Sequence, residues 1–197
     1  MEIKEIKDFL PPSLQRHVRN VLLDRDFDWH YISDVTFDDR DLDKGYKTQP
    51  GFFNLPLVNG TPQNKFFDFF SFFVPLLLDE YKKHYPPANV SLSRMRIGLN
   101  IPGDDDLGYN NPHIDHEGID TSRIKTNVVA LYYCDSTPGD TFIFNETERS
   151  SEYTIKRRVS PEQGKLVFFD GNHYHSSSSS KSKDVRVVIS FNLYEYH

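Results

Sequence analysis

The sequence predicts a mainly β domain with flanking helices, in which short strands build a sandwich or barrel. Strand-like runs separated by Gly, Pro and Asp turns follow one another after residue 90. Two helical patterns precede them, and the chain is rich in aromatic residues, with 16 Phe and 11 Tyr. Such large side chains suit a β-rich interior covered by helices. At 197 residues the chain fits one domain, residues 1–197.

Charge and cysteine content narrow the classes of partner. The net charge of −6 argues against nucleic acid and anionic membranes, although Lys156-Arg157-Arg158 is a local basic run. The first residues lack the apolar core of a signal peptide, and no apolar run reaches the length of a membrane span. The single cysteine, Cys134, excludes an internal disulfide. We therefore expect a cytoplasmic protein without a membrane anchor.

The first helix is predicted to start at Pro11-Pro12-Ser13, with Ser13 as N-cap. Leu14, Val18, Val21 and Leu22 recur at helical spacing and predict one packed face. From Asp24 to Lys44 the aromatic and acidic pattern indicates a strand or two with loops. The Gly- and Pro-containing stretch from Gly45 to Gly60 predicts an ordered loop near the mouth of a site.

A second, longer helix is predicted from Asn64 to Tyr85. Its polar residues form one narrow stripe, and Phe and Leu occupy the rest of the circumference. This pattern is typical of a core helix that supports a sheet, and core packing explains the Phe cluster better than a ligand pocket does. Pro86-Pro87 ends the helix.

The rest of the chain is predicted to be strands and turns. The expected strands are Ser91–Ile101, Asn127–Tyr133, Thr141–Phe144, Tyr153–Val159, Lys165–Phe169 and Val185–Tyr194. The serine run Ser176–Ser180, followed by Lys181-Ser182-Lys183, indicates a flexible, solvated hairpin loop. Its position between a histidine pair and the last strand places it at the rim of any site there.

The chemistry of the chain is predicted to centre on His113-Ile114-Asp115. Two residues apart on a strand, His113 and Asp115 share one face, and an imidazole with a carboxylate makes two corners of the 2-His-1-carboxylate triad that holds non-haem Fe(II). A lone H-x-D also occurs by chance on surface loops. His173 or His175 is the third corner, and spacing alone does not choose, since both would share a strand face. His116 would point to the opposite face.

The order of features behind this motif carries a resemblance. A strand at 127–133, the turn Thr137–Asp140, a strand at 141–144, Pro161–Gly164, a strand at 165–169, the histidine pair and Arg186 follow in turn. From Arg94 to Leu193 they resemble the 2-oxoglutarate- and Fe(II)-dependent dioxygenases, particularly the small prolyl-hydroxylase-like and phage-encoded members. The resemblance implies a double-stranded β-helix, or jelly-roll, core at about 89–197. A helical buttress at about 1–88 would place N-terminal α-helices on one sheet.

The same resemblance implies the roles of individual residues. His113, Asp115 and His175 would be the catalytic Fe(II) ligands, because the family's distal histidine precedes a basic residue by about ten positions and His175 lies eleven before Arg186. His173 remains as a supporting alternative. Arg186 would anchor the C5 carboxylate of 2-oxoglutarate, and Tyr133 would donate a hydroxyl to it. Further cofactor-binding candidates are Asn100, Ser190 and Asn192.

The implied function is a dioxygenase that uses Fe(II), 2-oxoglutarate and O2 to hydroxylate a C–H bond of a protein or small-molecule substrate, releasing succinate and CO2. If the chain is phage-encoded, it would work in the host cytoplasm. One rival is a cupin-like metal-binding or small-ligand-binding jelly-roll protein without 2-oxoglutarate turnover. Another is a non-catalytic jelly-roll binding module. The departures from the family, in the loop Gly103–Asp106 and the serine run, leave the substrate class open.

Overall fold

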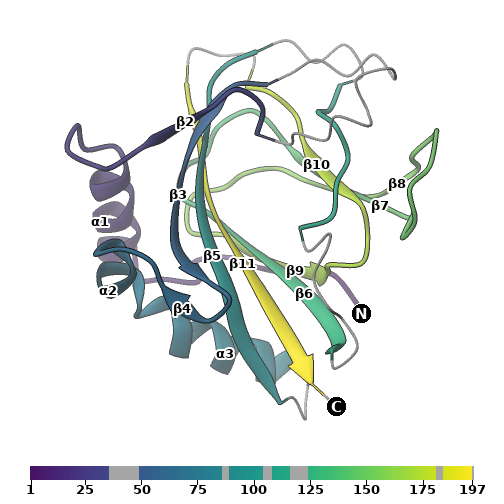
Figure 1. Ribbon diagram of the computed structural model, residues 1–197, viewed down its shortest axis with the longest axis horizontal. Coiled ribbons are helices and arrows are strands. Elements are labelled where there is room, and N and C mark those ends of the chain that lie inside the picture. The colour runs from purple at the N-terminus through teal and green to yellow at the C-terminus, as the bar shows by residue number, and fades with distance from the viewer. Residues whose placement is uncertain (36–48, 86–88, 104–107, 116–123, 181–183, 197) are drawn as a thin grey trace.

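Two antiparallel β-sheets form the framework of the molecule in the computed structural model, which describes residues 1–35, 49–85, 89–103, 108–115, 124–180 and 184–196 (Figure 1). The larger sheet has the order β1 (Lys4–Ile6), β9 (Leu166–Asp170), β6 (Ile124–Tyr133), β11 (Arg186–Tyr196), β5 (Val90–Asn100), β3 (Gly51–Val58) and β2 (His30–Ile32), and β4 (Thr61–Pro62) pairs with β3. The smaller sheet has the order β10 (His175–Ser177), β7 (Thr141–Phe144) and β8 (Ile155–Val159).

The path of the chain between these sheets is that of a jelly roll. From β6 in the larger sheet the chain enters β7 and β8 in the smaller one, returns as β9, crosses again as β10 and ends as β11. The predicted double-stranded β-helix core is therefore confirmed. Each strand predicted after residue 90 is present, with bounds that differ by at most three residues.

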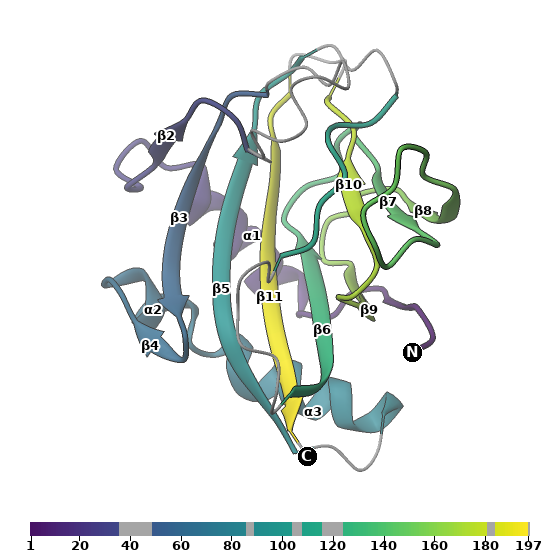
Figure 2. The same ribbon diagram turned by 45° about the vertical axis from the view of Figure 1, so that its right-hand side comes forward.

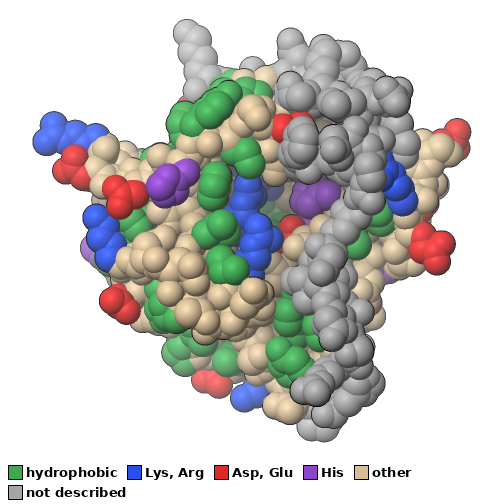
Figure 3. Space-filling model, viewed as in Figure 1, with side chains coloured by type: hydrophobic (Ala, Val, Ile, Leu, Met, Phe, Trp, Pro, Cys, Tyr) green, Lys and Arg blue, Asp and Glu red, His purple; other side chains and the backbone are tan. Residues whose placement is uncertain are grey.

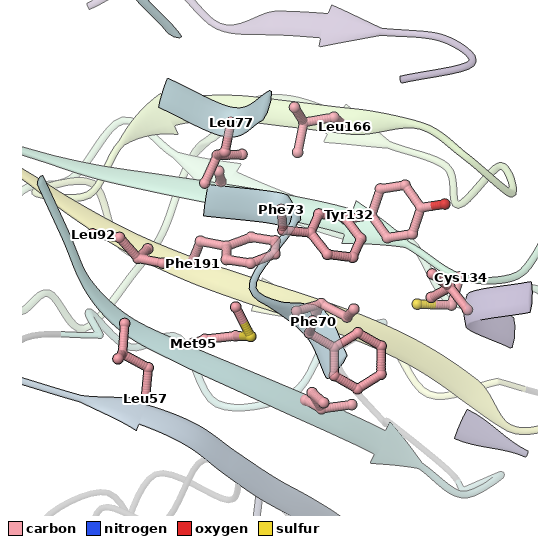
Figure 4. Close-up of a cluster of buried hydrophobic side chains, with 14 of the residues drawn as sticks. Leu57, Phe70, Phe73, Leu77, Leu92, Met95, Tyr132, Cys134, Leu166 and Phe191 are labelled. Carbon is pink, nitrogen blue, oxygen red and sulfur yellow. The ribbon is translucent and has the colours of Figure 1, made fainter. Parts of the chain in front are cut away.

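Three helices cover the outer face of the larger sheet: α1 (Pro12–Leu22), α2 (Phe66–Phe70) and α3 (Phe73–His84) (Figures 1 and 2). Alternate residues of the central strands point towards them, and Phe73 packs on Tyr132 and Phe191 with ring centroids 5.0 and 5.3 Å apart (Figure 4). A strand presents successive side chains to opposite faces, so this apolar layer leaves the other half of each strand for the inner face.

The inner face of the larger sheet is divided between apolar and polar side chains. Val129, Leu131 and Tyr133 of β6 pack with Val167 and Phe169 of β9 and with residues of the smaller sheet to close one part of the interior. The facing positions of β5 and β11 are polar: Arg94, Arg96, Asn100, Arg186, Ser190 and Asn192. The predicted cofactor-binding candidates Arg186, Ser190 and Asn192 of the last strand thus lie between the two sheets.

The single helix predicted from Asn64 to Tyr85 is wrong in one respect, because α2 and α3 are separate helices with a turn at Ser71 and Phe72. Pro75 explains the break. Its ring would clash with the carbonyl four residues earlier, at Ser71, and it has no N–H to donate. The polar stripe still faces outward across both helices, since Asp68, Pro75 and Asp79 are exposed.

The loop predicted from Gly45 to Gly60 is also wrong, because residues 51–58 form β3, while residues 45–48 lie outside the described residues. Gly51 marks a close approach rather than a turn: a Cβ there would lie 2.6 Å from Val35 Cγ1 and 2.8 Å from the carbonyl oxygen of Leu99. Pro56 stands where the pairing of β3 with β5 shifts register, a place where a missing N–H is tolerated.

Other N-terminal predictions meet a mixed outcome. The predicted N-cap is wrong: α1 begins at Pro12 with Pro11 as its cap, so Ser13 lies inside the first turn. The strand predicted within Asp24–Lys44 is present as β2, and residues 36–44 lie outside the described part of the chain. None of the helices described is long and apolar enough to cross a membrane.

The basic run Lys156-Arg157-Arg158 falls in β8, the outer strand of the smaller sheet as described. All three side chains are exposed, and two of them are paired: Arg157 with Glu5 and Arg158 with Asp140. The run is therefore part of a strand held to its neighbours by ion pairs.

The packing of α3 generates a test of stability. We expect Phe73→Ala to lower the free energy of unfolding by about 3–5 kcal/mol, because it removes a fully buried ring from the layer between helix and sheet. Leu76→Ala in the same helix is the control; Leu76 is exposed, and the expected change is within about 0.5 kcal/mol. Urea denaturation of both variants measures the difference. Equal losses would contradict this account of the core.

Candidate metal centre

Backbone hydrogen bonds bring His113 and His175 side by side, although 62 positions separate them. The two residues form an isolated antiparallel bridge: His113 N donates to His175 O at 3.0 Å, and His175 N donates to His113 O at 2.9 Å. Their imidazole rings lie with centroids 4.6 Å apart. The bridge joins the segment before Asp115, which lies outside the named strands, to the start of β10 in the smaller sheet.

The hydrogen bonds of the two rings direct their other nitrogens to one point. His113 Nδ1 lies 3.3 Å from the carbonyl oxygen of Asn111, and His175 Nδ1 lies 3.2 Å from that of His173. A carbonyl oxygen only accepts, so these contacts place the proton of each neutral ring on Nδ1. Each Nε2 then keeps its lone pair, as a metal-binding imidazole requires.

Asp115 completes the cluster. One carboxylate oxygen, Oδ1, lies 3.6 Å from His113 Nε2 and 3.8 Å from His175 Nε2, too far for hydrogen bonds. The ligand atoms of the three residues all lie within 4.8 Å of one another. The second oxygen, Oδ2, accepts a hydrogen bond of 3.1 Å from the side-chain amide of Asn192, which fixes the orientation of the carboxylate.

The electrostatic environment favours the metal-binding form of these groups. Burial, together with the neighbouring His175, lowers the pKa of His113 to about 4, so the ring is neutral at neutral pH. Burial raises the pKa of the Asp115 carboxyl, but His175, His113 and Arg94 together outweigh it, and the pKa lies well below its usual range. A neutral imidazole beside an ionised carboxylate matches the donor set of a divalent metal.

The structure separates His173 from His175, and the expectation that both share a strand face is wrong. The chain turns at Gly171 and Asn172, with His173 N donating to Asp170 O, and β10 begins only at His175. The His173 ring lies against the exposed Lys156, with His173 Nε2 and Lys156 Nζ 2.7 Å apart. His175 is therefore the one that joins His113 and Asp115.

The serine run is not the solvated loop that the sequence predicts. Ser176, Ser179 and Ser180 are buried, and Ser176 and Ser177 belong to β10. Ser176 Oγ donates to Asn110 O at 2.6 Å, and Ser177 O accepts from Asn110 N at 2.8 Å. The Ser176 hydroxyl and the Ser177 backbone carbonyl thus satisfy the backbone of Asn110, in the segment that leads to His113. The run does border the centre, as expected; residues 181–183 lie outside the described residues.

Arg186 occupies the far end of the pocket beside the cluster. Its guanidinium is buried, its Nε donates to Gly139 O at 2.9 Å, and Nη2 donates to Thr141 Oγ1 at 2.8 Å. Tyr133 Oη donates to the same Thr141 oxygen at 2.8 Å, and the Arg186 guanidinium lies 5.7 Å from the Tyr133 ring centre. Burial lowers the pKa of Arg186 and raises that of Tyr133.

The remaining predicted site residues are spread along the inner face. Asn100 pairs in register with Arg186, lines the pocket and donates to Ser177 Oγ at 3.3 Å. Ser190 lines the same pocket, whereas Asn192 contacts Asp115. Roles for these residues in cosubstrate binding stay predictions. His116 lies outside the described residues.

Sequence reasoning missed three polar residues of this pocket region: Thr141, Arg94 and Arg96. Thr141 gave no signal, since it looks like an ordinary strand residue and becomes informative only through Arg186 and Tyr133. The arginines could have been found. They alternate with the apolar Met95, Ile97 and Leu99 on β5, a two-residue pattern that places both arginines on one face of the strand.

Comparison with known proteins identifies the fold. No family model matches the chain, and no curated protein matches its sequence. Among solved structures, a 2OG-Fe(II) oxygenase family oxidoreductase from Burkholderia pseudomallei matches with TM-score 0.67 and 10% identity, over 98% of this chain and 84% of that one. The chain has the fold of the 2OG-Fe(II) oxygenases.

Two further structures with this fold are prolyl hydroxylases. The viral collagen prolyl hydroxylase of Paramecium Bursaria Chlorella virus-1 matches with TM-score 0.57 and 14% identity, over 98% of this chain and 96% of that one. The prolyl hydroxylase of Trichoplax adhaerens matches with TM-score 0.60 and 14% identity, over 98% and 83%. The likeness to prolyl-hydroxylase-like members is thus confirmed at the level of fold.

The cluster generates a test of metal binding. We expect His113→Ala, Asp115→Ala and His175→Ala each to weaken Fe(II) binding by more than about a hundredfold, because removing a ligand should cost more than removing a residue that only supports one. His173→Ala is the matched control and should bind Fe(II) like the parent. Anaerobic calorimetry measures all four. Loss of binding in His173→Ala with retention in His175→Ala would reverse the choice of ligand.

Asn192 allows a finer test. We expect Asn192→Ala to weaken Fe(II) binding by about tenfold to a hundredfold, since the Asp115 carboxylate loses the hydrogen bond that orients it. Calorimetric titrations of Fe(II) and 2-oxoglutarate measure the two affinities separately. If the variant keeps its iron affinity and loses 2-oxoglutarate affinity, Asn192 serves the cosubstrate instead.

Proposed function

We propose that the chain is a 2-oxoglutarate-dependent Fe(II) oxygenase that hydroxylates a C–H bond of a peptide or small-molecule substrate. The observation that carries the proposal is the combination of two features in one pocket. The cluster His113, Asp115 and His175 lies at one place in it, and the buried Arg186 lies at another. A metal chelator with a distant carboxylate is a ligand that would use both.

Arg186 argues most directly for such a ligand. Among the described residues no carboxylate forms an ion pair with it, and the nearby Asp140 pairs with Arg158. The guanidinium has five N–H donors, and the described residues offer it Gly139 O, Thr141 Oγ1 and the Tyr133 hydroxyl, which leaves donors for a ligand. A buried cation without a counter-ion is costly, so a bound carboxylate would supply the missing charge and acceptors.

The residues of the chain would divide the work among themselves. His113, Asp115 and His175 would hold the metal on one side and leave its other positions open. Arg186, with Thr141 and Tyr133, would receive the C5 carboxylate and so orient the rest of 2-oxoglutarate towards the metal. Iron, 2-oxoglutarate and O2 would together supply the oxidising chemistry, with succinate and CO2 as products.

The comparisons support this reading without deciding the substrate. A structure of the epimerase SnoN was solved with Fe3+, alpha ketoglutarate and nogalamycin RO, and the Trichoplax adhaerens enzyme was solved with a peptide fragment. Complexes with a small molecule and with a peptide therefore both occur on this fold. That the whole of residues 1–197 is one oxygenase domain, with a buttress at about 1–88 and a core at about 89–197, stays a prediction, as does a cytoplasmic location.

The proposal is tested by 2-oxoglutarate binding. We expect Arg186→Ala to weaken it by about 3–5 kcal/mol, roughly a hundredfold to several thousandfold, because the cosubstrate carboxylate would be left desolvated and unpaired. Fe(II) affinity should remain unchanged. The measurement is titration of 2-oxoglutarate into the anaerobic Fe(II) protein, following the visible charge-transfer band of the chelate.

Two controls sharpen this titration. Tyr133→Phe should cost less, about 1–2 kcal/mol, as a single hydrogen bond to a charged group. Arg16→Gln removes an exposed arginine of α1 and should titrate like the parent. If the parent shows no band, or if Arg186→Ala titrates like the parent, the cupin-like metal protein without 2-oxoglutarate becomes the better assignment.

A further inference from the structure

Two further arginines lie on the inner face of the larger sheet, apart from Arg186. Arg94 and Arg96 alternate along β5 and face the interior, and Arg96 lines the same pocket as His113 and Asp115. Figure 3 shows basic side chains beside a histidine in the hollow of this face, with hydrophobic side chains along their other side. Arg96 belongs neither to the metal cluster nor to the hydrogen-bonded pair Arg186–Thr141, so the roles described so far do not involve it.

Arg96 has no described counter-ion. Among the described residues no carboxylate forms an ion pair with it, whereas Arg94 Nη1 lies 3.9 Å from Asp115 Oδ1. The flat guanidinium of Arg96 rests over the Phe53 ring, 5.9 Å from its centre. The aromatic ring supports one side of the guanidinium and offers it no hydrogen-bond acceptor. No described residue accepts a hydrogen bond from this guanidinium, so its N–H donors would serve a ligand in the pocket.

The pocket as a whole carries an excess of positive charge. Of the described residues that line it, Arg96 and Arg186 are cationic and Asp115 is the one carboxylate. Arg94 adds a further positive charge beside Asp115. A ferrous ion and a 2-oxoglutarate dianion carry equal and opposite charges, so binding both leaves the excess as it was. A partly buried site of this kind favours one more anionic group.

The position of Arg96 argues that this group is not the distal carboxylate of the cosubstrate. In the strand register Arg186 pairs with Asn100, and Ser190 pairs with Arg96. The backbone of Arg96 is therefore four residues along β5 from the level of Arg186, about 13 Å at the rise of a strand. Its guanidinium lies nearer, beside Gly98 and over Phe53, at a level about two residues from Arg186. Arg186 thus stands farther along the strands from Asp115, whose contact Asn192 pairs with Arg94, and it is the arginine matched to a carboxylate distant from the metal.

We propose that Arg96, assisted by Arg94, binds a carboxylate or phosphate group of the substrate that is oxidised. That the bound molecule is a substrate rests on the proposed function, whereas the anion site itself rests on the structure alone. Gly98 keeps the path open: Arg96 Nη1 lies 3.6 Å from where a Gly98 Cβ would be, so a larger side chain would crowd the guanidinium. The substrate would thus be an acidic compound or an acidic residue of a peptide.

The test uses inorganic phosphate, acetate and the neutral acetamide as probes of the full-length protein. Calorimetric titrations are made on the metal-free protein and on the anaerobic protein loaded with Fe(II) and 2-oxoglutarate. We expect phosphate or acetate to bind and acetamide not to bind. Arg96→Gln should weaken the anion by at least about tenfold, as expected for a hydrogen-bonded charge. The matched control, Arg16→Gln, should bind like the parent.

The identity of the tighter anion, phosphate or acetate, tells which of the two groups the substrate carries. Arg96→Lys keeps the charge without the planar fork and should recover part of the affinity, which also provides a reading if Arg96→Gln fails to fold. Equal anion binding by the parent and both Arg96 variants would overturn the inference. So would a loss of 2-oxoglutarate affinity in Arg96→Gln as large as in Arg186→Ala, because it would assign Arg96 to the cosubstrate.

The two proposals fail separately. A parent protein without a 2-oxoglutarate charge-transfer band would overturn the oxygenase assignment. The phosphate and acetate titrations on the metal-free protein would still decide whether Arg96 is an anion site.

Discussion

The antiparallel bridge between His113 and His175 is the contact on which the candidate centre depends. Two backbone hydrogen bonds tie a segment outside the named strands to the start of β10, and the carbonyl oxygens of Asn111 and His173 then orient the two rings. Both rings are thereby oriented with Nε2 on the side of Asp115. The backbone thus sets the positions from which the three side chains converge.

That backbone arrangement is possible because the two faces of the larger sheet differ in composition, one apolar and one partly polar. The outer face buries its apolar residues under α1, α2 and α3, and this layer supplies the hydrophobic stabilisation of the fold. The inner face is then free to carry arginine, asparagine and serine between the sheets. A second apolar cluster around Val129 and Phe169 closes one end of the interior, which leaves the polar part as a bounded pocket.

Patterns of two-residue alternation and family resemblance predicted much of this arrangement. The β-rich core, the apolar helices and the choice of His175 were expected from residues that repeat or stand in a known order. The failures have local causes. Gly51 and Pro56 look like turn residues but serve close packing and a register shift, and Pro75 divides a helix whose apolar pattern continues. The serine run looked solvated because its acceptors, in the segment around Asn110, are distant in sequence.

The charges of β8 bear on the solubility of the folded chain. β8 is the outer strand of the smaller sheet as described, and an outer strand exposes unpaired backbone groups to which another polypeptide could add. Lys156, Arg157 and Arg158 surround these groups with like charges, and the ion pairs to Glu5 and Asp140 hold two of them in place. A sequence with so many Phe and Tyr residues is thereby protected against strand-to-strand aggregation at this edge.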